Sequence, residues 1–131
     1  GVITADEFAV FQNAGYMGLY GGMTVDDIHR KKNLEVGQKI LDYMGSTELI
    51  ANLFRISQTE EKLRKDGVDS ADTATAVHYK VGSEVREAIE KIGGTMPEDL
   101  PTPEKSIAQL EKEQLQRLKQ QALDGQLMLD E

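Results

Sequence analysis

Hydrophobic and polar positions along the 131-residue chain recur with the spacing of amphipathic helices. The clearest pattern covers 70–92, where apolar residues repeat every three or four positions before Gly93 and Gly94. This spacing places them on one face of a helix with 3.6 residues per turn. No segment shows the polar–apolar alternation of a half-buried strand, so the pattern predicts an all-α fold. The residues of this stripe are Ala74, Val77, His78, Val81, Val85, Ala88, Ile89 and Ile92.

A second long helix is predicted over 46–66, because apolar residues again share one face and Gly67 can end it. Gly82, in the middle of the other long helix, costs up to about 1 kcal/mol relative to alanine. A glycine at that position predicts a close crossing of two helices. We expect the buried stripe of the 46–66 helix to consist of Leu49, Leu53, Ile56 and Leu63, widened by Ile50 and Phe54.

The N-terminal part is predicted to hold shorter helices. Thr4 and Glu7 form a capping box, so a first helix should run from there to about 14 and stop at Gly15. A short helix from Thr24 to about 32 and another over 36–44 should follow. The whole chain, 1–131, is therefore predicted to be a single compact domain, with short helices first and three longer ones after residue 46.

The C-terminal part is predicted to begin with an extended connector over 95–102, since the residue before a proline is biased away from helical geometry. Thr102 and Pro103 suit the N-cap and first position of a last helix that reaches about 123. Its apolar residues do not share one clean face and span too few heptads to predict a coiled coil. The tail 124–131 can pack back on the body, pair with another copy or extend freely.

Composition narrows the classes of function. The net charge of −8 opposes general attraction to nucleic acid or anionic lipid. The absence of cysteine excludes disulfides and thiol catalysis. No apolar run approaches the roughly 20 residues that span a bilayer, so no membrane association is expected. A start at Gly1 instead of methionine suggests a fragment of a longer protein.

The glycine-rich stretch 12–23 is the first candidate for a ligand loop. A phosphate loop requires a particular glycine spacing and a following lysine, which this stretch lacks, and the acids at 26 and 27 would repel phosphate. We interpret it as a structural turn that lays the first helix against the rest, with two tyrosines as plugs whose hydroxyls satisfy loop backbone groups. The turn comprises Gly15, Tyr16, Gly18, Tyr20, Gly21 and Gly22.

One cationic cluster in the first half is a candidate contact for nucleic acid or a partner. It lies at the end of a predicted helix, where cations also complement the helix dipole. No metal-binding spacing and no nucleophile motif is present, so the sequence predicts no metal, no cofactor and no catalytic residue. His78 is interpreted as a buried histidine with satisfied hydrogen bonds. The cluster comprises His29, Arg30, Lys31, Lys32 and Lys39.

Long strings of the chain carry a family resemblance: FQNAGYMGLYGG, IHRKKNLEVGQKILDYMGSTELIANLFRISQTEEKLRKDGV, HYKVGSEVREAIEKIGGTMPEDLPTP and SIAQLE. From about 4 to about 110 the chain resembles the C-terminal half of the DNA-damage-inducible protein D family. The resemblance implies a cytoplasmic bacterial protein linked to the SOS response, recombination and DNA repair. It also implies an absent N-terminal half similar to the antirepressor-type BRO-N domain, and it supplies no catalytic residues.

Three functional hypotheses follow. The favoured one is a non-enzymatic domain that contacts a protein or nucleoprotein partner at damaged DNA, with a homodimer as an option. The second is a direct DNA-binding module that uses the cationic cluster, although nucleic acid is expected mainly at the absent N-terminal half. The third is an enzyme that processes nucleic acid. Residues 112–131 receive no role from the sequence.

Overall fold

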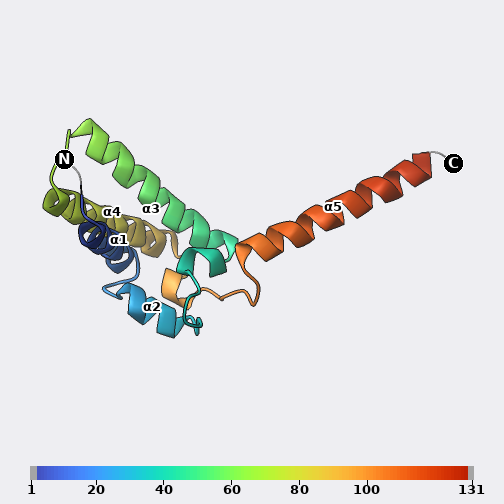
Figure 1. Cartoon of the computed structure of the whole chain (residues 1–131), viewed down its shortest axis with the longest axis horizontal. Coiled ribbons are helices and arrows are strands. Elements are labelled where there is room, and N and C mark those ends of the chain that lie inside the picture. The colour runs from blue at the N-terminus through green and yellow to red at the C-terminus, as the bar shows by residue number, and fades with distance from the viewer. Residues whose placement is uncertain (1–2, 130–131) are drawn as a thin grey trace.

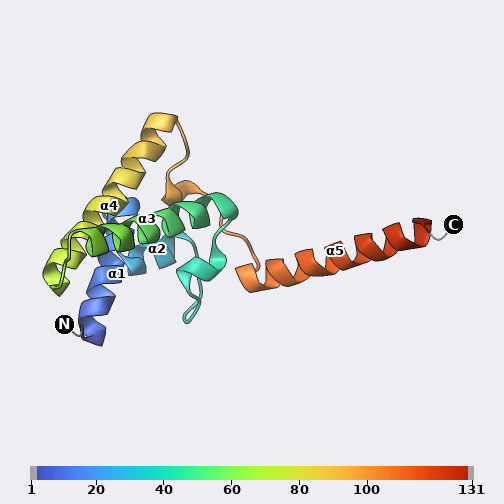
Figure 2. The ribbon, with the colours of Figure 1, turned by 90° about the horizontal axis from the view of Figure 1, so that it is seen from above.

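The computed structural model describes residues 3–129, and these form a helical body with one projecting helix. Helices α1 (Ala5–Leu19), α3 (Ser46–Lys65) and α4 (Ala71–Ile92) build the body, and the short α2 (Val25–Lys31) packs beside them (Figure 1). Helix α5 (Ile107–Leu129) extends away from the body in both views (Figures 1 and 2). Since no strand occurs within 3–129, the predicted all-α class is confirmed.

Helices α1 and α4 cross backbone to backbone through glycines. A Cβ atom on Gly82 of α4 would lie 2.7 Å from the carbonyl oxygen of Gly15 and 2.9 Å from the amide nitrogen of Leu19. A Cβ atom on Gly18 would lie 2.9 Å from the amide nitrogen of Ser83. These distances leave no room for any side chain, so the predicted close crossing at Gly82 is confirmed.

The glycine turn is shorter than predicted, because α1 continues through the first part of it to Leu19. Gly15 and Gly18 lie inside α1, where the lack of a side chain serves the crossing with α4. The turn itself uses Gly21 and Gly22, whose φ angles of 67° and 96° lie in the left-handed region that favours glycine. The prediction that Gly15 ends the first helix is therefore wrong.

Tyr16 and Tyr20 are buried as predicted, but the Tyr20 hydroxyl bonds differently. It donates to the carboxylate of Glu48 on α3 and accepts a hydrogen bond from Nδ2 of Asn52 at 3.0 Å. The predicted bonds from this hydroxyl to loop backbone are wrong, because its ring lies against a polar face of α3. The apolar core around the two tyrosines contains Leu19, Ile28, Ile40 and Met44.

Helix α3 begins and ends close to the predicted positions, but it buries another face. Leu53 and Phe54, which the pattern placed in the core, are each 51% exposed, and Ile50 is 65% exposed. Polar residues at helical spacing take their place, since hydrogen-bonding groups of α1 and α4 lie opposite them. The prediction is wrong for Ile50, Leu53 and Phe54. The other three, Leu49, Ile56 and Leu63, are half-buried, and Leu49 packs against the apolar core. The residues that α3 buries, each at most 2% exposed, are Glu48, Asn52, Arg55 and Thr59.

The segment predicted as a helix over 36–44 is mostly a loop. Only the 3₁₀ turn η1 (Ile40–Tyr43) is helical there. Gly37 adopts a φ angle of 87°, and the amide of Gln38 donates to the carbonyl of Glu35 at 3.0 Å. This tight turn prevents a longer helix, because its glycine leaves the right-handed helical region.

Helix α5 begins later and ends later than predicted. It starts at Ile107 instead of Pro103, because the Ser106 side chain accepts a hydrogen bond from the amide of Gln109 at 3.3 Å and caps the helix. It also continues through 124–129, so that part of the expected tail is helical. Residues 130–131, and the side chains from 126 onward, lie outside the described part of the tail.

The connector between α4 and α5 is tied to the body by two cations. It contains a short 3₁₀ turn, η2 (Pro97–Asp99), within the segment predicted to be extended. The Arg86 guanidinium of α4 donates to both carboxylate oxygens of Glu98, at 2.6 and 2.8 Å. The Lys32 ammonium donates to the carbonyl oxygens of Pro97 and Leu100, at 2.8 and 2.6 Å. The connector therefore follows a defined path over α2.

Candidate functional site

Lys32, which belongs to the predicted cationic cluster, is buried in the core. The side chain of Lys32 is 4% exposed, and its Nζ lies 3.1 Å from a carboxylate oxygen of Glu48. Together with its two bonds to the connector, this ion pair occupies the ammonium group. Lys32 is therefore a structural residue, and it cannot contact DNA or a partner in this fold.

The other members of the cluster lie at the surface, but most have partners within the chain. His29 Nε2 lies 2.8 Å from a backbone oxygen. Arg30 pairs with an acid of its own helix at 2.7 Å, and Lys31 lies 3.8 Å from an acid of η2. Lys39 is exposed beside the start of η1. Neighbouring acids thus offset much of the positive charge that a phosphate backbone would require.

The centre of the domain is a buried polar network. Arg55 stands at its middle: one guanidinium nitrogen lies 2.8 Å from Nε2 of His78, and another donates to Oδ1 of Asn52 at 2.8 Å. The same guanidinium stacks on Tyr16, with its central carbon 4.5 Å from the ring centroid. Burial lowers the pKa of Arg55. The members of this network are Tyr20, Lys32, Glu48, Asn52, Arg55 and His78.

The network is closed. In the described part of the chain, every fully buried side-chain nitrogen and oxygen has a hydrogen-bond partner. Burial, with the hydrogen bond to Glu48, raises the pKa of Tyr20 and keeps its hydroxyl protonated as a donor. No group of the network points at an open cavity with a bond unmade, so we interpret it as the element that fixes the packing of α1, α3 and α4.

Acidification is expected to destabilise the domain through His78. Burial, and then the Arg55 guanidinium, holds the pKa of His78 down at about 4. The unfolded chain, with a pKa of about 6.5, binds a proton that the folded domain excludes, so the free energy of unfolding falls as the pH drops from about 6.5 to 4. Urea denaturation at pH 7 and pH 4.5 should reveal a His78 contribution of about 2 kcal/mol. A His78→Gln variant should lose less than wild type over this range. An equal loss in both would contradict the assignment.

The surface between α3 and α4 carries an apolar groove, which we call the α3–α4 groove. At one end it encloses about 380 Å³ and is lined mainly by aliphatic and aromatic side chains. Phe54 and Ile50 of α3 face Val85, Ile89 and Ile92 of α4 across it. Exposed apolar residues gathered in this way are typical of a surface that binds a protein.

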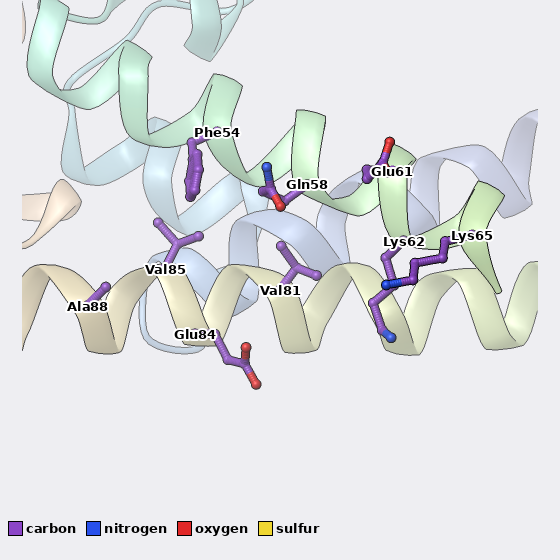
Figure 3. A pocket seen from close by; sticks show the side chains of 9 residues that line it. All are labelled: Phe54, Gln58, Glu61, Lys62, Lys65, Val81, Glu84, Val85 and Ala88. Carbon is purple, nitrogen blue, oxygen red and sulfur yellow. The ribbon is translucent and has the colours of Figure 1, made fainter.

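The groove continues along the two helices toward a charged end. Figure 3 shows Phe54 directed toward Val85, with Lys62 and Lys65 farther along α3. This part encloses about 430 Å³ and shares Phe54 and Val85 with the apolar end. Lys62 already pairs with Asp66 at 2.8 Å. The groove is therefore apolar over much of its length and of mixed charge at the end of α3, where Glu61 and Glu84 lie beside Lys62 and Lys65.

The sequence pattern did not predict the buried polar network or the α3–α4 groove, and the reason is the same for both. Glu48, Asn52, Arg55 and Thr59 repeat at the spacing of a helix face, which is a signal of a buried stripe even when the residues are polar. Once that face is assigned to the core, the apolar residues of the opposite side must lie at the surface. The sequence shows both stripes, and only the packing of α3 decides which of them is buried.

Within 3–129, no group of three or more His, Asp or Glu side chains is placed to hold a metal ion. None of the helices in that range combines the length and apolar character that crossing a membrane requires.

The sequence of this chain matches that of known proteins. The family model described as the DinD C-terminal domain matches residues 1–110. The chain is 61% identical over 111 residues to DNA damage-inducible protein D of Escherichia coli (strain K12). The aligned residues make up 85% of this chain and 40% of that relative. The chain thus spans about two fifths of the length of that relative. No solved structure matches this chain.

Proposed function

Because the chain belongs to the DinD C-terminal domain family, we propose that it is the protein-binding part of a bacterial DNA-damage-response protein. In this proposal the domain performs no catalysis. It acts in the cytoplasm through protein or nucleoprotein contacts during the SOS response, DNA recombination and repair. Contact with DNA itself falls mainly to the other part of the full-length protein.

The observation that carries this proposal is the α3–α4 groove. Ile50 and Phe54 expose more than half of their surface, at 65% and 51%, beside the aliphatic residues of α4. Leaving such residues in water forgoes a burial energy of about 1.5–3 kcal/mol for each side chain, which a partner can recover. A helix laid in such a groove is a common mode of protein recognition.

The test replaces Phe54 in the full-length protein and measures binding to a bacterial recombinase filament on single-stranded DNA. Phe54→Asp is expected to weaken binding at least tenfold, because it places a charge in the apolar groove. The matched control is Leu53→Asp, since Leu53 is also 51% exposed on α3 but does not line the groove. Equal binding by the two variants would contradict a role for the groove.

The same measurement addresses direct DNA binding by this domain. Charge reversal of Arg30, Lys31 and Lys39 should leave filament binding unchanged if the groove is the contact. Binding of the isolated domain to bare DNA, with a salt dependence that these reversals flatten, would favour the DNA-binding hypothesis instead.

A further inference from the structure

Helix α5 leaves an apolar surface without a partner on its own chain. It contacts η1 where it leaves the body and then extends outward in both views (Figures 1 and 2). Leu115 and Leu118 are 53% and 54% exposed, and Leu110 is 38% exposed. The chain thus presents an uncovered apolar helix and an uncovered apolar groove together.

Leu115, Leu118 and Ala122 lie on one face of α5, because helical rotation of 100° per residue brings them within about 60° of one another. Leu110 precedes Leu115 by about 1.4 turns and is rotated by about 140° from it. Glu111 shares this face, whereas Asp124 lies about 160° from Ala122, on the opposite side of the helix, where it is hydrogen-bonded to Gln120 at 3.0 Å. The apolar side chains therefore belong to the first and middle turns of α5.

The α3–α4 groove also has an apolar part. Ile50 and Ile92 lie at its apolar end, Phe54 lies in the middle, and Lys62 and Lys65 lie at the other end. From Ile50 to Lys65 the groove runs about 22 Å, at 1.5 Å per residue. The span of α5 from Leu110 to Asp124 is about 21 Å on the same basis. Length and apolar character agree when α5 runs parallel to α3, because its leucines then lie toward the apolar end of the groove.

We propose that the α3–α4 groove receives α5 of a second copy of this chain. In this arrangement α5 lies parallel to the partner's α3. Its leucine-bearing turns lie at the apolar end of the groove. The inference rests on the proposed function, because it names the occupant of the same groove. The form that meets other partners is then a homodimer.

The direction of α5 explains why the partner is a second copy. Helix α3 runs from the junction with η1 toward one end of the molecule, and α5 runs from the same junction toward the other end (Figure 1). The helix therefore points away from its own groove. When it lies parallel to the α3 of a second copy, that copy's α5 points back toward the first groove. Both exchanges then form about a single two-fold axis and close the assembly.

The experiment measures the solution mass of the chain by sedimentation equilibrium for wild type and three exposed-site variants. We expect wild type and Leu53→Asp to be dimers, and Phe54→Asp and Leu118→Asp to be monomers with unchanged helical circular dichroism. An equimolar mixture of Phe54→Asp and Leu118→Asp should regain a dimer, since one intact helix meets one intact groove. A wild-type monomer at every concentration would overturn the exchange.

The mixture separates this exchange from other pairings. If two α5 helices paired directly, Phe54→Asp would remain a dimer, and if two grooves paired, Leu118→Asp would remain one. Either result overturns the proposal.

Filament binding distinguishes failure of this inference from failure of the proposed function. A monomeric wild type whose Phe54→Asp variant still loses filament binding would refute the exchange and leave the protein-binding role standing. A dimer that dissociates in Leu118→Asp, with filament binding unchanged in both groove and helix variants, would refute that role and leave the exchange standing.

Discussion

Glu48→Ala is expected to lower the free energy of unfolding by about 3–5 kcal/mol, because it leaves the buried Lys32 ammonium without its acid. Glu48 is 1% exposed, and its two carboxylate oxygens bind Lys32 and the Tyr20 hydroxyl. The substitution removes both bonds and opens a cavity beside α1. Chemical denaturation followed by circular dichroism measures the loss.

Two further variants serve as controls for Glu48→Ala. Glu61→Ala removes a surface ion pair to Arg64 whose side chains are 64% and 72% exposed, so it should cost less than about 1 kcal/mol. The double variant Glu48→Leu with Lys32→Met should recover part of the loss, since removing both members of a buried pair costs less than removing one. If Glu48→Ala costs no more than Glu61→Ala, the buried pair contributes little to stability.

Gly82→Ala and Gly18→Ala are each expected to cost about 2–3 kcal/mol, despite the higher helix propensity of alanine. A Cβ on Gly82 would meet backbone of α1 at 2.7 and 2.9 Å, and backbone cannot rotate away as a flexible side chain can. Helices α1 and α4 must then separate, which loosens the packing around Tyr16 and Tyr20. Thermal and urea denaturation both measure the effect.

The matched control for the glycine variants is Gly125→Ala in α5. A Cβ at that position has nothing within 4 Å, so the substitution should leave stability unchanged or raise it by up to about 1 kcal/mol. A loss at Gly125 equal to that at Gly82 would show that the crossing has no special requirement for glycine.

The glycines of α1 and α4 show which contacts the sequence can predict and which it cannot. Gly82 interrupts a strong helical pattern, so its presence already indicated a close contact. Gly15 and Gly18 carry the same role on the other helix, but they stand in a glycine-rich stretch that also suits a turn. Only the position of α4 distinguishes the two uses, because a glycine at a crossing and a glycine at a helix end look alike in sequence.

Helix α3 shows why its buried face could not be predicted from the sequence. Two sets of residues repeat at helical spacing along α3, one apolar and one polar, and hydrophobicity favoured the apolar set, whereas the polar set is buried. Glu48 and Arg55 became the buried face because Tyr20, Lys32 and His78 approach from other elements and satisfy them. Since these partners are distant in the chain, no local pattern predicts them. The groove and the loss of Lys32 from the cationic cluster follow from the same packing.

The sequence by itself determined the all-α class, the extents of α2, α3 and α4 within a few residues, and the family. These depend on backbone hydrogen bonds between near neighbours and on helical spacing, which are local properties. The tertiary structure alone decided that α1 passes through its glycines, that α3 buries its polar face, and that α5 projects from the body with its leucines exposed. Each of these depends on which distant groups meet, because a polar residue is buried only where another element supplies its hydrogen bonds.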